Sequence, residues 1–316
     1  MSGMRATSLR LALRLHRFEA AAFAIVIAGL VVAAFVVAGW LDGTGYGRLC
    51  LDPTGTAVLP PTCEAIGARF SDLQARLASP IAGLLVILSF VAALLIGVAV
   101  IAREIERGTT RLAWSLAPSR RRWYVTRVLP LLVALLVITF LAGIATDRLA
   151  AAAQPGADPA NSFDGFGQRG GLIAARSMFI FAIAVLVGAL LGRTLPALIV
   201  AALVAYIGLG GGEDVHDRII RSEAIVVPEA QVRPGDRWVD QQFQLPDGRL
   251  VGWDVVEQLD PPKPDVEWIP KYPMVAIIVP GARYRFVEAR EAGALLGGSF
   301  LALGLGGLVV TRRRPD

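Results

Sequence analysis

The amino-acid sequence predicts an all-α polytopic membrane protein with six transmembrane helices and a small α+β extracytoplasmic insert between helices five and six. The first observation is composition: the 316-residue chain is 55% hydrophobic, with a mean hydropathy of +0.58, which is typical of membrane proteins. The second is a set of six charge-poor runs long enough to cross a bilayer core. The six runs are 20–41, 77–102, 128–146, 170–192 with Arg176 inside it, 194–212, and 292–311. Such runs form helices, because backbone polar groups in lipid must be satisfied within the segment.

The arginine distribution predicts the orientation of these helices. Fifteen arginines fall on one side of the membrane, against five in the short loops 42–76 and 147–169 on the other. The arginine-rich side comprises residues 1–19, 103–127, 193 and 312–316. By the positive-inside rule this side is cytoplasmic. We therefore expect a multi-pass protein of the bacterial plasma membrane with both termini in the cytoplasm, the bacterial origin being inferred from 29 arginines against two lysines.

The first outer loop carries the two cysteines of the chain, Cys50 and Cys63. In an oxidising compartment a disulfide between them is expected, because nothing else in this loop supplies a core; two free thiols are the alternative. No metal site is expected, because His16 and His216 are isolated from each other and from the cysteines.

The segment 213–291 is too polar for lipid and is expected to form a small outer domain. It carries 10 basic and 15 acidic residues, so nucleic acid is not an expected partner. Residues 238–245 and 249–256 flank Pro246-Asp247-Gly248, which predicts a β-hairpin. Residues 275–279 are expected to add a strand, and 283–292 a helix leading into the last span. The domain either gates or binds substrate, or it is a lid that orders the outer ends of the helices.

Glycines four residues apart predict close helix packing. The pairs are Gly188 with Gly192 and Gly293 with Gly297, and Gly304 and Gly307 follow in the last span. Small residues let helices approach closely in lipid, and we expect these to form seams within the bundle rather than a dimer interface.

Charged residues inside spans are usually functional, and Arg176 is the one such residue in the predicted spans. It is expected either to reach the outer headgroups or to face a cavity and meet an anionic substrate group. Ser177, Thr139 and Tyr206 could line the same path, or they could simply bond the helix backbone. No set of nucleophile, base and orienting partner is present in the sequence, so we expect no catalytic residue in this chain.

The segment 103–127, REIERGTTRLAWSLAPSRRRWYVTR, lies between the second and third runs. The sequence has no GxxxxGK[ST] phosphate loop, so energy for active transport must come from a partner. Helical spacing predicts two faces, with a stop at Pro118-Ser119. One face carries Ile105, Thr109, Leu112 and Leu116, and the other carries Glu104, Arg107 and Arg111. A helix of this kind, continuous with a span, would transmit the movement of a docked subunit into the membrane. The alternative is an interfacial helix that holds topology and binds anionic headgroups, which gives no reason for Glu106 or for Gly108 inside a helix.

At these residues the chain resembles the permeases of the type-2 ABC exporter family, grouped with the type V exporter fold. Members carry an R-E-x-E-x-G-T-x-x-L stretch after the second span, followed by a P-x-S-R or similar turn. The stretch reads here Arg103-Glu104-Ile105-Glu106-Arg107-Gly108-Thr109-Thr110-Arg111-Leu112, and the turn reads Ala117-Pro118-Ser119-Arg120 without a spacer. The sequence around Trp114 and Trp123 looks particularly like that of actinobacterial members.

The resemblance implies a membrane-spanning permease subunit of an ATP-driven ABC exporter. It implies a coupling helix near 103–118 seated on a separate ATP-binding subunit, present in two copies, with ATP and Mg bound there and no cofactor bound by this chain. It also implies a second permease copy, identical or related, around the translocation path. The residues expected to couple to the ATPase are Glu104, Glu106, Arg107, Gly108, Thr109, Arg111, Leu112, Leu116, Pro118, Ser119 and Arg120.

The expected organisation is helices one to five in 1–212, the insert in 213–291, and the sixth helix with a cytoplasmic tail in 292–316. The alternative function is a non-transporting membrane sensor or assembly factor whose outer domain binds a ligand.

Overall fold

The computed structural model describes residues 2–51, 60–109, 114, 119–261 and 271–313, and it describes the side chains of all of these except 2–20 and 210–219. The chain folds into two compact units. The helical unit comprises Met1–Pro155, Gly165–Gly212 and Glu288–Asp316, and the insert unit comprises Gly156–Asp164 and Glu213–Val287. The insert unit therefore includes a segment between the third and fourth predicted spans that sequence analysis did not assign to it.

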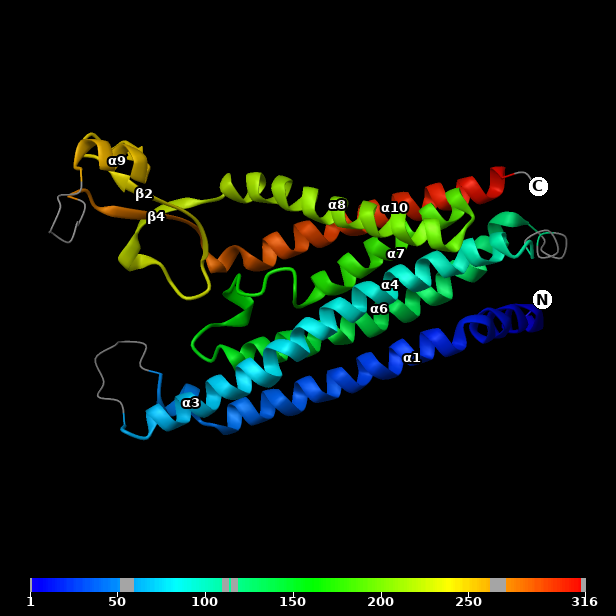
Figure 1. Cartoon of the computed structure of the whole chain (residues 1–316), viewed down its shortest axis with the longest axis horizontal. Helices are drawn as coiled ribbons and strands as arrows, with labels where there is room; N and C mark the ends of the chain where they lie inside the picture. The colour runs from blue at the N-terminus through cyan, green and yellow to red at the C-terminus, as the bar shows by residue number, and fades with distance from the viewer. Residues whose placement is uncertain (1, 52–59, 110–113, 115–118, 262–270, 314–316) are drawn as a thin grey trace. The chain divides into compact units, whose positions relative to one another are not determined.

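The helical unit is built from long apolar helices that lie side by side (Figure 1). Their bounds are α1 Ser2–Gly43, α4 Ser79–Glu106, α6 Arg120–Ala153, α7 Gly171–Leu191, α8 Thr194–Arg221 and α10 Tyr284–Arg312. Within the described residues, five segments are long and apolar enough to cross a membrane. These are Ala21–Leu49, Cys63–Glu106, Arg120–Ala153, Gly171–Leu191 and Gly281–Arg312. The chain is thus a multi-pass membrane protein, and the fifth expected span, 194–212, corresponds to a shorter apolar stretch, Thr194–Leu209.

Small residues set the closest helix contact, between α4 and α7. A Cβ atom at Gly97 of α4 would lie 2.7 Å from the Cβ of Ala184 and 2.8 Å from the carbonyl oxygen of Phe181. A Cβ at Gly188 of α7 would lie 3.3 Å from the carbonyl oxygen of Val98. Because glycine has no side chain, the two backbones can approach closely, and dispersion contacts between them stabilise the helix pair. The prediction of a seam at Gly188 is confirmed.

The glycines of α10 behave differently from one another. Gly307 packs against the ring of Tyr124, where an added Cβ would lie 3.3 Å from the Cε1 atom of the ring. At Gly293, Gly297 and Gly304, no described atom lies within 4 Å of the position that a Cβ would take. The prediction that Gly293 and Gly297 form a seam inside the bundle is therefore wrong for the described part of the chain.

The first outer loop contains the predicted disulfide. Cys50 and Cys63 are bonded, and both are buried. Cys63 begins α3, Cys63–Leu73, which continues through a π-helical turn, Gln74–Ala78, into α4. The rings of Tyr46, in the short helix α2 (Tyr46–Leu49), and Phe70 stack with their centroids 4.6 Å apart.

The insert unit contains a four-stranded antiparallel sheet of order β1-β4-β2-β3. Its strands are β1 Ile225–Pro228, β2 Arg237–Gln244, β3 Leu250–Val251 and β4 Met274–Val279. The predicted hairpin is present: Phe243 pairs with Val251, and Gly248 in the turn has a φ of 82°. The backbone amide and the side chain of Arg249 both donate hydrogen bonds to the carboxylate of Asp247. These bonds, the backbone one first, lower the pKa of the Asp247 carboxyl. The strand at 275–279 is also confirmed.

The second hairpin strand is shorter than expected. Residues Trp253–Leu259 form helix α9, so the prediction of a strand reaching Val256 is wrong. Asp254 stands in the first turn, where a carboxylate is favourable. The ring of Trp253 meets Phe243 edge to face, with the centroids 4.6 Å apart. This tertiary contact favours the helix over the local strand preference.

One end of the helical unit gathers segments that are distant in sequence. The start of α1, the end of α4, the start of α6 and the end of α10 lie at the same end (Figure 1). The arginine-rich segments of the sequence therefore share one end of this unit, which we call the arginine-rich end.

Candidate functional site

Helix α4 ends earlier than the sequence predicted. The amide of Arg107 donates to the carbonyl of Arg103 (3.2 Å), and the amide of Gly108 donates to the carbonyl of Ile105 (3.0 Å). Gly108 then has a φ of 69°, which is unfavourable for residues with a Cβ. The expectation that Gly108 lies inside a helix continuous from the span is therefore wrong, because this glycine ends α4. Arg111, Leu112, Leu116 and Pro118 lie outside the described residues.

The chain re-enters a helix at Ser119, which is the N-cap of α6. Its hydroxyl accepts a hydrogen bond from the amide of Arg122 (3.2 Å), as expected of a serine that satisfies a free helix amide. Thr109 also contributes locally, since its hydroxyl donates to the carbonyl of Glu104 (3.2 Å). Hydrogen bonds of the Thr109 and Ser119 hydroxyls thus lie at the two ends of the segment that the sequence predicts to dock. The side chain of Arg107 is exposed.

A buried ion pair joins α4 to α6 at this end. An Oε1 atom of Glu104 lies 2.6 Å from Nη1 of Arg127, and the two side chains are only 7% and 16% exposed. The guanidinium of Arg127 also lies over the ring of Trp123, 6.0 Å from its centroid. A pair this well buried is costly to break, because the remaining charge would stay without water or a partner.

Glu106 connects α4 to the start of α8. Its Oε2 atom accepts hydrogen bonds from the backbone amide of Thr194 (3.0 Å) and from the hydroxyl of the same residue. Thr194 begins α8, and a carboxylate is stabilised there by the free amides and the positive end of the helix dipole.

Two arginines cap the opposite, negative ends of other helices. Arg120, in the first turn of α6, donates through Nη1 to the carbonyls of Arg313 (2.6 Å) and Thr311 (3.2 Å) at the end of α10. Arg313 in turn donates through Nη1 to the carbonyl of Ala189 (2.7 Å), near the end of α7. Arg120 also lies over the ring of Trp114, 4.6 Å from its centroid.

Together these groups form an end network, which we define as Glu104, Glu106, Arg120, Arg127 and Arg313. The network links α4 to α6, α4 to α8, α6 to α10 and α10 to α7. Every link includes an ionised side chain, which makes its hydrogen bonds stronger than those between neutral groups. The sequence pattern predicted roles for Glu104, Glu106 and Arg120 but not for Arg127 and Arg313; for Arg313, its position directly after α10 was the available signal.

The other end of α7 carries a second set of charged contacts. Arg176 pairs with Glu291 of α10, with Nη2 and Nε lying 2.7 and 3.1 Å from the same Oε1 atom. The two side chains are 15% exposed. The sequence predicts Arg176 at the headgroups or against an anionic substrate group, and no local pattern indicates Glu291 as its partner.

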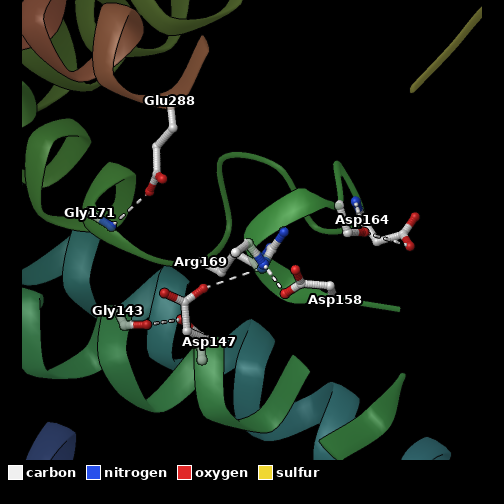
Figure 2. A network of polar contacts seen from close by, with 10 residues as sticks. Gly143, Asp147, Asp158, Asp164, Arg169, Gly171 and Glu288 are labelled. Carbon is white, nitrogen blue, oxygen red and sulfur yellow. Dashed lines mark hydrogen bonds and ion pairs between the residues drawn. The ribbon is translucent and has the colours of Figure 1, made fainter. Parts of the chain in front are cut away.

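Two further carboxylates lie near the start of α7. Glu288 of α10 points toward the first turn of α7 and accepts a hydrogen bond from the amide of Gly171 (3.2 Å) (Figure 2). Asp147 of α6 points toward the buried side chain of Arg169, at 3.5 Å (Figure 2). With Arg176 and Glu291, these contacts join α6, α7 and α10.

The other expected path residues occupy different surroundings. Thr139 is buried, and its hydroxyl donates to the carbonyl of Leu135 (2.8 Å) in its own helix. Ser177 is fully buried, and its hydroxyl has no hydrogen-bond partner among the described residues. Tyr206 on α8 is 78% exposed.

The family model described as ABC-2 membrane transporter related matches residues 20–210 of this chain. No curated protein and no solved structure matches the chain. The match runs from α1 into α8 and includes Glu104, Glu106, Arg120 and Arg127 of the end network. The protein therefore belongs to the ABC-2 membrane transporter related family and is the membrane component of a transporter.

Proposed function

We propose that this chain is the permease subunit of an ATP-driven ABC exporter and that its arginine-rich end receives the motion of a separate ATP-binding subunit. Family membership supports a place in an ABC transporter complex. In this proposal the segment 103–120 docks on the ATP-binding subunit, which exists in two copies and binds ATP and Mg. A second permease copy, identical or related, completes the translocation path.

The end network is the observation that carries the proposal. A force applied between the end of α4 and the start of α6 acts directly on Glu106 and Arg120. Glu106 holds the start of α8, and Arg120 holds the end of α10. Rigid helices transmit displacement along their length, so a push at this end can reach the far end of each helix. An interfacial helix that only fixes topology would not require these links.

The proposal includes six spans, both termini in the cytoplasm, and the insert unit outside. The fifth of these spans is the 194–212 part of α8, which extends about 28 Å at 1.5 Å per residue. The large exposed side chains of α8, such as Leu195 and Ile199 at 67% and 62%, suit contact with lipid. The location of the charge-rich ends agrees with the positive-inside rule.

The path through the membrane is proposed to pass near the outer end of α7. Ser177 is included because its hydroxyl has no hydrogen-bond partner among the described residues; since it is fully buried, a substrate would reach it only after α7 separates from its neighbours. Arg176 is proposed to act there together with Glu291, as a gate between α7 and α10 rather than as a free cation. Thr139 and Tyr206 receive less support, because the first bonds its own helix and the second is exposed.

Purification of the tagged full chain from its native host in mild detergent tests the proposal. We expect an ATP-binding protein to co-purify at equal stoichiometry and the complex to hydrolyse ATP. Recovery of a kinase or a secretion component instead, with no ATPase activity in the preserved complex, would support a sensor or assembly factor and contradict the proposal.

A further inference from the structure

The insert unit contains a groove of about 830 Å³ beside its sheet. One wall is the exposed part of Ile225 and Val227 of β1 together with Ile278 of β4. Ile225 pairs with Ile278 across the strands, so these side chains share one face of the sheet. The other walls come from residues 156–161, residues 230–236 and the start of the segment after β4. Ligand sites for small molecules commonly have volumes of about 300–1,000 Å³.

The backbone around the groove is held in a fixed arrangement. Asp236 accepts hydrogen bonds from the amides of Arg233 and Gly281, both at 2.8 Å. A Cβ at Gly281 would lie 1.9 Å from the carbonyl oxygen of Asn161, and one at Gly235 would lie 2.9 Å from the same atom. Only glycine permits this approach of three chain segments. The groove is therefore formed in advance of any ligand, which lowers the entropic cost of binding.

The polar groups of the groove differ in how far they are already engaged. Asp236 already accepts the two backbone hydrogen bonds given above. Asp158 accepts hydrogen bonds from the amide of Ala160 (3.0 Å) and the side chain of Asn161 (2.6 Å). The side chain of Arg233 is exposed, and the described residues offer it no ion pair or hydrogen bond. The groove thus presents an apolar wall, two carboxylates that already accept hydrogen bonds from neutral amides, and the exposed side chain of Arg233.

The charge of the whole segment narrows the class of ligand. Residues 213–291 carry five more acidic than basic residues, so a ligand with several negative charges would be repelled at long range. A single anionic group meets Arg233 in a charge-assisted hydrogen bond. Additional affinity must then come from apolar surface against Ile225, Val227 and Ile278.

We propose that this groove binds an amphipathic anion of small-molecule size, with its apolar body on the β1–β4 face and one carboxylate, sulfate or phosphate group on Arg233. The occupant is either a free compound outside the cell or a membrane lipid with an anionic headgroup. The proposal concerns binding by the insert unit and does not depend on coupling to an ATP-binding subunit.

The test uses the full chain in phosphatidylcholine nanodiscs, with 11-(dansylamino)undecanoate as a fluorescent probe and its methyl ester as the uncharged counterpart. We expect saturable fluorescence enhancement above empty nanodiscs. Arg233→Gln should weaken binding of the carboxylate about tenfold or more, because a hydrogen bond to a charged group is lost, and should leave the ester unaffected. Ile225→Asp should weaken both ligands, whereas Arg249→Gln, a charge change in the exposed hairpin turn, should weaken neither.

Phosphatidylglycerol in the nanodiscs separates the two sources. Competition with the probe assigns the groove to a lipid headgroup, and undiminished binding assigns it to a free compound. No saturable binding, or equal carboxylate affinity of wild type and Arg233→Gln, would overturn the proposal. Because no ATP-binding subunit is present in this experiment, its failure would leave the transporter assignment unaffected.

Discussion

The guanidinium of Arg120 donates a 2.6 Å hydrogen bond to the backbone carbonyl of Arg313, although the two residues are 193 positions apart. The first turn of α6 is thereby attached to the last turn of α10. Arg313 in turn donates a hydrogen bond to the carbonyl of Ala189, which attaches the end of α10 to α7. Two arginines that the positive-inside rule counted toward the predicted orientation also cap the negative ends of two helices.

Arg120→Ala should lower ATP hydrolysis by the assembled complex, while it lowers the stability of the chain only modestly. Loss of the cap on α10 should lower the free energy of unfolding by about 1–2 kcal/mol and should lower ATP hydrolysis by the assembled complex. Thermal unfolding in detergent and an ATPase assay measure the two effects. Arg121→Ala is the matched control, because Arg121 is exposed; an equal loss of activity in both variants would show that general charge, not the cap, is responsible.

The Glu104–Arg127 pair should behave as one unit. Glu104→Gln and Arg127→Gln should each destabilise the chain by about 3–5 kcal/mol, because each leaves a buried charge without its partner. In a double-mutant cycle, Glu104→Gln combined with Arg127→Gln should destabilise by less than the sum of the two single substitutions. Asp72→Asn removes the exposed pair with Arg76 and should change stability by about 0–1 kcal/mol. Additive single effects in the cycle would mean that the two side chains do not interact.

Removal of the Cys50–Cys63 disulfide should destabilise the first outer loop. The double substitution to serine should lower the free energy of unfolding by about 3 kcal/mol in the chain-entropy treatment of a loop of this length. Thermal unfolding with and without reductant measures it, and the serine variant should be insensitive to reductant. Two reactive thiols in the untreated wild-type protein would contradict the prediction.

Exchanging the charges of Arg176 and Glu291 should preserve most of the thermal stability of the chain. Arg176→Glu alone should destabilise by about 3 kcal/mol, since it places two carboxylates together at a site only 15% exposed. The addition of Glu291→Arg should restore most of the lost thermal stability. Arg148→Gln, which breaks a more exposed pair with Asp42, should have little effect. Failure of the exchange to restore stability would mean that Arg176 is held by another group.

Local patterns predicted the elements that depend on local physics. Long charge-poor runs predicted α1, α4, α6, α7 and the last part of α10, because lipid leaves few alternatives to a helix. The hairpin around Asp247 followed from its turn residues, and the disulfide followed from the placement of both cysteines in one outer loop. These predictions required no knowledge of distant neighbours.

The features that were missed depend on partners remote in the sequence. No local signal pairs Arg176 with Glu291 or directs Arg313 to Ala189. The helix α9 replaced part of a predicted strand through the contact of Trp253 with Phe243. Gly108 was assigned to a helix interior because the flanking residues kept helical spacing, whereas its positive φ ends the helix.

The central claim is that the arginine-rich end transmits the motion of an ATP-binding subunit through Glu106 and the start of α8. The most direct test is the ATPase activity and subunit content of the purified complex in nanodiscs for wild type, Glu106→Lys and the control Glu257→Lys, which makes the same charge reversal at an exposed position of α9. We predict that Glu106→Lys reaches the membrane in normal amount but loses the bound subunit or its permease-dependent ATPase activity, while Glu257→Lys retains both. Full assembly and ATPase activity of Glu106→Lys would contradict the account.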